Sequence, residues 1–239
     1  WENSKKAPEG KIIKILGQAG EHNTEMLSIA IEKGFEENFP KEVLNEIEKI
    51  KEIEIKKEDS TGRRDFRDIL TFTIDPIDAK DFDDAISFKQ ISDKEYEIGI
   101  HIADVSHYVK KDSDIDNEAK KRGTSVYLVN RTIPMLPLIL SNDLCSLIPK
   151  KDRLTVSAVF IIDQNAKIKS QYFGRTIIHS QKRFTYEEAE KYIKNASLIM
   201  TKKNGQLNDP LEKALFILNN IAKKLTKERF VNGAISLEQ

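Results

Sequence analysis

Residues 69–86 read ILTFTIDPIDAKDFDDAI, and this stretch joins two apolar segments through a cluster of acids. Ile69–Ile74 and Ala85–Ile91 are rich in the β-branched and aromatic residues typical of strands. Between them, DPIDAKDFDDA (75–85) places five carboxylates within ten residues. Because carboxylates this close repel one another, the cluster costs stability unless something positive neutralises it. We therefore expect a strand, an acidic loop and a second strand here.

Further strands and helices are predicted from the spacing of apolar residues. In Tyr96–Ile102 apolar and other residues alternate, with Tyr96, Ile98, Ile100 and Ile102 on the face expected to be buried. A capping box of Thr185 and Glu188 begins one late helix, and Asp209 and Pro210 begin another. The other expected elements are strands at Lys11–Leu16, Ser125–Val129, Leu154–Asp163 and Lys167–Ile178, helices at Thr24–Lys33, from Pro40 onward and at Ile115–Arg122, and a charged linker at Lys51–Arg67. The predicted class is α+β, with a mostly antiparallel sheet and flanking helices.

The composition indicates a globular protein with a heavily charged surface. Hydrophobic residues make up 39% of the 239 residues and charged residues 33%. No apolar run approaches the roughly 20 residues that span a bilayer. The first residues lack the apolar core of a signal peptide, and the single Cys145 excludes an internal disulfide. We therefore expect a cytoplasmic protein. With 39 basic and 39 acidic residues the net charge is zero, so a uniformly basic surface is not expected, although a local basic channel stays possible.

The acidic loop is a candidate magnesium site. Magnesium is commonly held by a few carboxylates together with water and substrate phosphates. Two such ions about 4 Å apart can activate a water molecule and stabilise the leaving oxygen in phosphodiester cleavage. The alternative is a solvated turn, since Asp75-Pro76 is typical of turns. Phe82 inside the cluster and the apolar strands around it favour the metal site.

Other chemistries fit the sequence less well. An EF-hand loop counted from Asp81 would need Gly and Glu where Ile86 and Ser92 stand. No cysteine pair is present, and the histidines lack zinc-ligand spacing. Cys145, within the apolar run LCSLI, is interpreted as a core residue rather than a nucleophile. His101 and His107 are interpreted as structural.

Several segments resemble, in order, the catalytic domain shared by ribonuclease II and ribonuclease R. They are TIDPIDAKDFDDAI (73–86), IGIHIADVSHYV (98–109), AKKRGTSVYLVNRTIPMLPLILSNDLCSLIP (119–149) and KRFTYEEAEKYI (182–193). EGKIIKILG (9–17) resembles the end of the family's second cold-shock domain, and RRDFRD (63–68) favours ribonuclease R. The resemblance implies a cold-shock (OB-fold) tail at 1–17, a helical linker at 18–62 and the first half of the catalytic domain, known as the RNB type, at 63–239.

This resemblance implies a processive, magnesium-dependent enzyme that degrades single-stranded RNA from its 3′ end and releases nucleoside 5′-monophosphates. The family's four signature aspartates correspond to Asp75, Asp81, Asp83 and Asp84. Asp83 is then the most critical for chemistry, and the other three place the metals. Asp78 lies outside the set.

Two tyrosines are implied as RNA contacts. Tyr127 corresponds to the family tyrosine that stacks on terminal bases, and a half-buried strand aromatic is the alternative. Tyr186 corresponds to a second RNA-contacting tyrosine, and simple packing at the start of a helix is the alternative. The intact protein is expected to be monomeric and to have no membrane partner.

Both ends of the sequence suggest an excerpt. It begins at Trp1 and stops at GAISLEQ (233–239), where another strand is expected to start. In the family, residues beyond this point supply a catalytic arginine and a second base-clamping aromatic, so activity of the chain alone is in doubt. A non-catalytic RNA-binding relative is the alternative function, and an endonuclease or phosphatase with a similar carboxylate site is a third.

Overall fold

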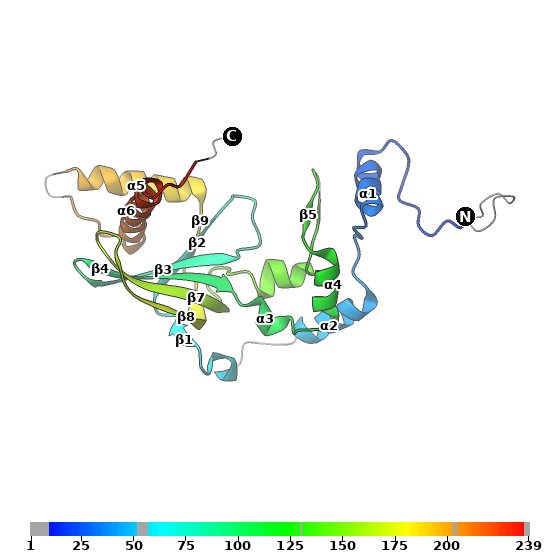
Figure 1. Ribbon diagram of the computed structural model, residues 1–239, viewed down its shortest axis with the longest axis horizontal. Helices are drawn as coiled ribbons and strands as arrows, with labels where there is room; N and C mark the ends of the chain where they lie inside the picture. Colours follow the sequence, from blue (N-terminus) through cyan, green and yellow to red (C-terminus); the bar gives the residue numbers. More distant parts are fainter. Residues whose placement is uncertain (1–9, 52–56, 130, 203–204, 237–239) are drawn as a thin grey trace.

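A curled sheet of seven strands forms the centre of the structure (Figure 1). The computed structural model describes residues 10–51, 57–129, 131–202 and 205–236. The strand order is β1-β8-β7-β4-β3-β2-β9. The inner pairs are antiparallel, whereas β1 with β8 and β2 with β9 run parallel at the two edges. The predicted α+β class with a mostly antiparallel sheet is confirmed.

Of the seven strands of this sheet, β2, β3, β4, β7 and β8 follow predicted apolar segments closely, whereas β1 lies in the predicted linker and β9 was not predicted. The bounds of the seven strands are β1 (Arg64–Phe66), β2 (Leu70–Asp75), β3 (Asp84–Ser92), β4 (Glu95–Ala103), β7 (Asp152–Asp163), β8 (Ile168–His179) and β9 (Lys182–Thr185). A separate two-stranded ribbon pairs β5 (Val126–Tyr127) with β6 (Thr132–Ile133). Of the strand predicted at Ser125–Val129, only two residues are therefore paired.

The helices are α1 (His22–Glu32), α2 (Lys41–Lys51), α3 (Val105–Tyr108), α4 (Asp114–Arg122), α5 (Tyr186–Met200) and α6 (Pro210–Val231), with a 3-10 turn η1 (Lys57–Ser60) and a π-helical turn η2 (Leu140–Leu144). Helix α1 stands away from the sheet, and the others pack near it in two groups (Figure 1). Figure 1 shows α5 and α6 together on one side of the sheet, and α2, α3 and α4 near its other end. The predicted capping box of Thr185 and Glu188 is formed, and the Asp209 side chain caps α6.

Each helix group closes its own hydrophobic core. Under α5 and α6, Phe72 and Phe184 are fully buried and meet edge to face, with ring centroids 5.6 Å apart. The other core joins α2 to the sheet and to the acidic loop through buried residues such as Ile47, Phe66 and Phe82. The acidic loop is thus attached to the protein by an apolar anchor.

The strand predicted at Lys11–Leu16 does not form. Residues 10–18 have no regular secondary structure, and Ile12, Ile13 and Ile15 are exposed. None of the described strands pairs with this segment, and an isolated strand cannot satisfy its backbone hydrogen bonds with another strand. The short apolar segment closed by Gly17 was therefore not sufficient to predict a strand.

Three further expectations need correction. The linker predicted at Lys51–Arg67 contains η1 and β1, and Phe66 in β1 is buried against the ring of His101, with centroids 5.0 Å apart. In β4, Ile100 and Ile102 are about half exposed, whereas His101 is fully buried. The curl of the sheet explains this reversal, because it brings β1 over the His101 face of β4. The strand expected to begin near the end is not present at 234–236, and 237–239 lie outside the described residues.

Candidate functional site

The acidic loop connects two neighbouring antiparallel strands and is anchored at several points. β2 ends at Asp75 and β3 begins at Asp84, so residues 76–83 lie outside both strands. The Leu147 N–H donates to the carbonyl of Phe82 at 2.8 Å, and the Ala103 N–H donates to the carbonyl of Asp83 at 3.0 Å. These bonds fix the backbone of the second half of the loop.

The structure brings the four predicted aspartates into one electrostatic group. Asp75 is 8% exposed, whereas the side chains of Asp81, Asp83 and Asp84 are exposed. Asp83 interacts with each of the other three, and Asp75 interacts with both Asp81 and Asp84. Asp81 and Asp83 line one cavity of about 350 Å³. Asp81 also borders a second cavity of about 430 Å³, together with Asp78.

Two of these carboxyl groups have raised pKa values. Partial burial raises the pKa of Asp83, and repulsion by Asp81, Asp84 and Asp75 adds to the effect. Burial also raises the pKa of Asp75, with a smaller contribution from nearby acids. The nearby Thr73 hydroxyl and the positively charged Arg183 guanidinium lower the pKa of Asp75 and so oppose part of this rise. The protein therefore holds negative charge here at a cost in stability.

The donor set fits an oxygen-preferring cation. One oxygen of Asp75, Oδ2, is buried and accepts no hydrogen bond from any described residue. An unpaired buried carboxylate oxygen is costly, and a cation would satisfy it. Among the described residues, no three His, Cys, Asp or Glu side chains are grouped closely enough to form a metal cage by themselves. Magnesium does not require such a cage, because it commonly retains water and binds substrate phosphates.

Tyr127 lies beside the acidic loop, in the short β5 strand. Its side chain is 75% exposed, so the half-buried strand aromatic considered as the alternative is not what the structure contains. Tyr127 lines both cavities that Asp81 borders, and Ser125 and Ser141 line them as well. An exposed aromatic ring next to a carboxylate cluster offers a flat surface on which a base could stack.

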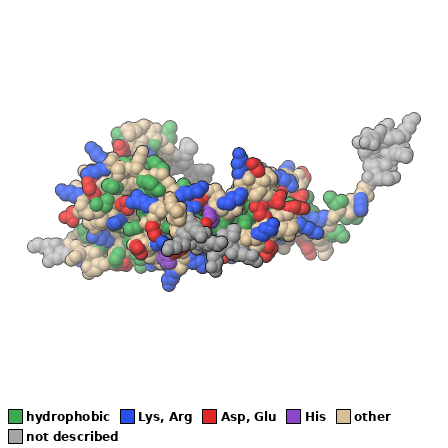
Figure 2. All heavy atoms as spheres, turned by 90° about the horizontal axis from the view of Figure 1, so that it is seen from below, with side chains coloured by type: hydrophobic (Ala, Val, Ile, Leu, Met, Phe, Trp, Pro, Cys, Tyr) green, Lys and Arg blue, Asp and Glu red, His purple; other side chains and the backbone are tan. Residues whose placement is uncertain are grey.

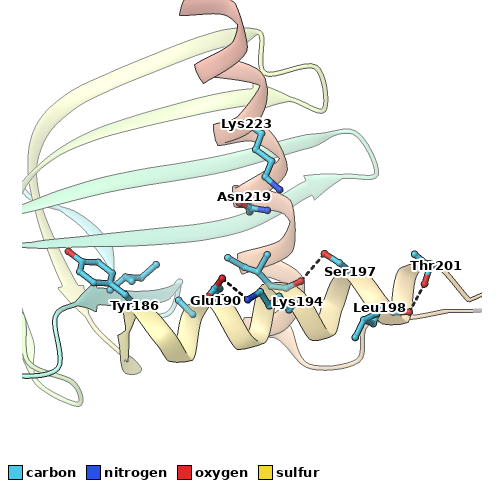
Figure 3. Close-up of a pocket in the computed structure, with 11 residues that line it drawn as sticks. Tyr186, Glu190, Lys194, Ser197, Leu198, Thr201, Asn219 and Lys223 are labelled. Atoms are coloured by element: carbon cyan, nitrogen blue, oxygen red, sulfur yellow. Dashed lines mark hydrogen bonds and ion pairs between the residues drawn. The ribbon is translucent and has the colours of Figure 1, made fainter. Parts of the chain in front are cut away.

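Tyr186 faces a different cavity. It is the first residue of α5 and is 57% exposed. Figure 3 shows it at one end of a cavity of about 810 Å³, below Asn219 and Lys223 of α6. Lys194, in the middle of this cavity, is paired with Glu190 at 2.7 Å. Tyr186 lines one cavity, and Asp81 and Tyr127 line another. The two cavities have no lining residue in common.

His101 and Cys145 have structural surroundings, as expected. His101 is fully buried, and its two ring nitrogens lie 2.7 Å from Ser157 Oγ and 2.8 Å from Ser87 Oγ. Burial lowers its pKa to about 4. Cys145 is buried, and this raises the pKa of its thiol to about 12, which is unsuitable for a nucleophile at neutral pH. His107 packs edge to face on Tyr108 and lies 3.8 Å from Asp59.

Sequence reasoning missed three residues around the acidic loop. Arg183 donates to the Pro76 carbonyl and places its guanidinium over the Phe82 ring, 5.6 Å from the centroid. Ser146 and Arg153 are buried behind the loop. Arg183 lies in KRFTYEEAEKYI (182–193), two residues before the N-cap Thr185, so this basic residue could have been singled out from the sequence. Ser146 gave no such signal, because its partners are 64 and 66 residues away in sequence.

The surface is mixed in charge on the face that Figure 2 displays, where lysines and arginines are interspersed with acids. This distribution agrees with the zero net charge and gives no uniformly basic face in that view. A long apolar helix of the kind that crosses a bilayer is absent from the part of the chain that the structure describes.

Comparisons with known proteins agree on one family. The RNB domain matches residues 63–239, and a cold shock domain matches residues 1–40. Ribonuclease R of Thermotoga maritima is 40% identical over 96% of this chain, which spans 32% of that protein. Ribonuclease R of Mycoplasma genitalium, solved with ribose-methylated single-stranded RNA, superposes with a TM-score of 0.79 at 29% identity, over 94% of this chain and 34% of that one.

A more distant structure shares the fold alone. Yeast Ssd1, described as a pseudonuclease, has a TM-score of 0.70 at 21% identity, over 94% of this chain and 27% of that one. The chain thus spans about a third of the ribonuclease R proteins it resembles. Because the RNB match covers residues 63–239, with the acidic loop near its start, the chain belongs to the RNB-domain family.

Proposed function

We propose that this chain provides the acidic part of the active site of a 3′-to-5′ exoribonuclease of the ribonuclease R type. The enzyme would hydrolyse RNA processively and release nucleoside 5′-monophosphates. The observation that carries the proposal is the shared cavity of Asp81, Asp83 and Tyr127. It combines carboxylates suited to phosphodiester chemistry with an exposed ring suited to base stacking. Membership of the RNB family supports the same activity.

Asp75, Asp81, Asp83 and Asp84 would hold magnesium. Without a cation these four acids would repel the phosphates of RNA, because like charges at short range are unfavourable. Magnesium bound here would supply an activated water molecule and stabilise the leaving oxygen. The protein's own contribution is to gather the carboxylates around one place. Asp83 interacts with all three of the others, so we assign it the largest effect on turnover.

The two tyrosines would contact single-stranded RNA at different places. Tyr127, next to the acids, would stack on a base near the 3′ end, and stacking of this kind tolerates any base. Tyr186 borders the cavity between α5 and α6 and would contact RNA farther from the reacting phosphate. Both ring faces are accessible enough for this role, since each side chain is more than half exposed.

The remaining features of the proposal concern the protein as a whole. Residues 1–17 would be the tail of a cold-shock domain, 18–62 a helical linker and 63–239 the catalytic domain's first half. The match of a cold shock domain to residues 1–40 supports a cold-shock segment in the first part of the chain, and it extends past residue 17 into the proposed linker. We also propose a monomeric protein that acts in the cytoplasm, which the single buried cysteine favours.

The alternative is a family member that binds RNA without cutting it. The fold cannot separate the two, because a pseudonuclease shares it. The retained aspartates favour the enzyme, since a binding protein gains nothing from four mutually repelling acids near the RNA path.

Degradation of an RNA labelled at its 5′ end separates these functions. Because the chain spans about a third of its relatives, the assay is run on this chain and on a longer polypeptide that contains it. Progressive shortening from the 3′ end supports the proposal, and Asp83→Asn should abolish it while RNA still binds. Internal cuts would indicate an endonuclease, and a retarded but intact RNA would indicate the non-catalytic relative.

A further inference from the structure

A single buried serine, Ser146, bonds the backbone on both sides of Asp81. The Phe82 N–H donates to Ser146 Oγ at 3.0 Å, and the Ser146 hydroxyl donates to the carbonyl of Lys80 at 3.0 Å. Ser146 is fully buried. The Ser146 hydroxyl thus accepts a hydrogen bond from the residue after Asp81 and donates one to the residue before it.

Asp81 depends on this contact for its position. Within the described residues no hydrogen bond reaches Asp81 itself, and its side chain is exposed in the two cavities. The loop around it belongs to neither β2 nor β3. Its direction is therefore set by the flanking peptides, which are held by Ser146 and by the Leu147 N–H on the Phe82 carbonyl.

Ser146 is in turn held by a buried arginine. Arg153, near the start of β7, donates from Nε to the Ser146 carbonyl at 2.8 Å. Its Nη2 donates to the carbonyl of Asp143 at 3.0 Å, at the end of the π-helical turn η2. Because Arg153 is 8% exposed and belongs to a central part of the sheet, it transmits the rigidity of the sheet to Ser146.

We propose that Ser146 is a positioning residue that holds Asp81 in the direction needed to bind a divalent cation. This inference rests on the proposed function, because it assumes that the four aspartates bind such an ion. Residues that fix a ligand from behind commonly change metal affinity strongly although they do not touch the ion. Loss of the Ser146 hydroxyl would free the peptides around Asp81 and leave the fold around β7 in place.

Binding of Mn²⁺ tests this without any requirement for catalysis. Mn²⁺ is titrated into the 239-residue chain and the free ion is followed by electron paramagnetic resonance, with thermal unfolding measured in parallel. Ser146→Ala should weaken binding by about tenfold, at the lower end of effects seen for such residues. Ser146→Thr retains the hydroxyl and should bind within about threefold of the original chain.

Ser157→Ala is the matched control. Ser157 is also buried, at 2% exposure, and its hydroxyl bonds three buried partners, His101, Thr176 and Thr155, but it lies within the sheet. It should lower the unfolding temperature in a similar way and leave Mn²⁺ affinity unchanged. If Ser146→Ala does not fold, Ser146→Cys replaces it, since the thiol has a similar shape and bonds far more weakly.

The outcomes separate the inference from the proposed function. Failure of the original chain to bind Mn²⁺ at all would overturn both. Binding that is normal in the original chain and equally tight in Ser146→Ala would overturn only the role of Ser146. Equal weakening in Ser146→Ala and Ser157→Ala would also overturn it, because the effect would then follow general stability.

Discussion

Arg63 and Asp104 form a buried ion pair, in which Arg63 Nη2 donates to Asp104 Oδ2 at 2.6 Å. The two side chains are 5% and 1% exposed. Arg63 also donates to the carbonyl of Thr155, so it joins the segment before β1 to the centre of the sheet. Asp104 directly follows Ala103, whose N–H holds the carbonyl of Asp83. The pair therefore secures the strand end against which the acidic loop is anchored.

Arg63→Met should destabilise the chain by about 3–5 kcal/mol, the usual effect of removing the main partner of a buried charge, because the other cation near Asp104, Arg175, is farther away, at 3.9 Å, and 66% exposed. Urea unfolding followed by circular dichroism measures it. Arg64→Met is the matched control, because Arg64 pairs with Glu97 at the same 2.6 Å but is itself 40% exposed. That change should cost less than about 1 kcal/mol. Equal losses of unfolding free energy in the two variants would show that the buried Arg63–Asp104 pair stabilises the chain no more than the exposed Arg64–Glu97 pair does.

Asp104 should stop stabilising the folded protein at acidic pH. Burial by itself raises its pKa, but hydrogen bonds from Ser106 and Arg63 outweigh burial and hold the pKa below its usual value of 3.8. An acid with a lowered pKa in the folded state stabilises the protein above the unfolded pKa and loses this effect as pH falls through the folded one. The cost of Asp104→Asn should thus be full at pH 7 and shrink below pH 3.8. A cost that stays constant down to about pH 2 would contradict the assignment.

Asp83→Asn should stabilise the metal-free chain, whereas Asp104→Asn should destabilise it. The raised pKa of Asp83 means that the folded state binds its proton more tightly, so the ionised group destabilises the fold as pH rises above the unfolded value. Because the side chain is exposed and partly screened, the gain at pH 7 should be small, about 1–2 °C in unfolding temperature. Calorimetry at pH 7 and at pH 3 checks it, since the gain should vanish at the lower pH. A lowered unfolding temperature at pH 7 would mean that Asp83 is held by a positive partner instead.

Any exonuclease activity should require a hard cation. EDTA should abolish it, and magnesium or manganese should restore it, whereas zinc alone should not, because oxygen ligands favour hard ions. In the chain itself, magnesium should raise the unfolding temperature, since an ion that binds only the folded state stabilises it. Asp83→Asn should lose most of this rise. Cleavage that persists in thoroughly chelated buffer would rule out the metal mechanism.

The acidic loop and its flanking strands could be predicted because their signals are local. The change from apolar β-rich segments to DPIDAKDFDD marks both strand ends to within one residue of β2 and β3. The capping box at Thr185 is equally local, and it formed as predicted. What these patterns could not provide is the arrangement of the loop's supports, since Ser146, Arg153 and Arg183 reach it from distant parts of the chain.

The errors have a common physical origin in tertiary context. A short apolar segment such as Lys11–Leu16 becomes a strand only beside another strand, and none of the described strands pairs with it. The face of a strand that is buried depends on what covers it, which is why His101 is buried and Ile102 is not. In β4 the polar partners Ser87 and Ser157 allow the histidine to be buried, because each ring nitrogen has a hydroxyl within 2.8 Å.

Replacement of the two candidate RNA-contacting tyrosines should separate their roles. Tyr127 shares a cavity with Asp81 and Asp83, whereas Tyr186 lines the cavity between α5 and α6. Tyr127→Ala should therefore alter the length of the final product and weaken the grip on the 3′ end, because one stacking surface beside the acids is lost. Stacking is worth about 1–3 kcal/mol per base, which corresponds to roughly a 5- to 150-fold loss of affinity for a short RNA.

Tyr186→Ala should instead weaken the binding of longer RNAs more than the binding of short ones, and it should leave the length of the final product unchanged. Fluorescence anisotropy with RNAs of increasing length measures affinity, and a denaturing gel reads the end product. Tyr127→Phe and Tyr186→Phe keep the rings and should behave as the original, since the ring face carries the interaction. Single-bond cleavage by Tyr127→Ala should slow less than binding weakens, because the carboxylates remain in place. If Tyr127→Ala changes neither the product nor the affinity, the ring contributes only to the local surface of β5, and RNA must approach Asp81 by another route.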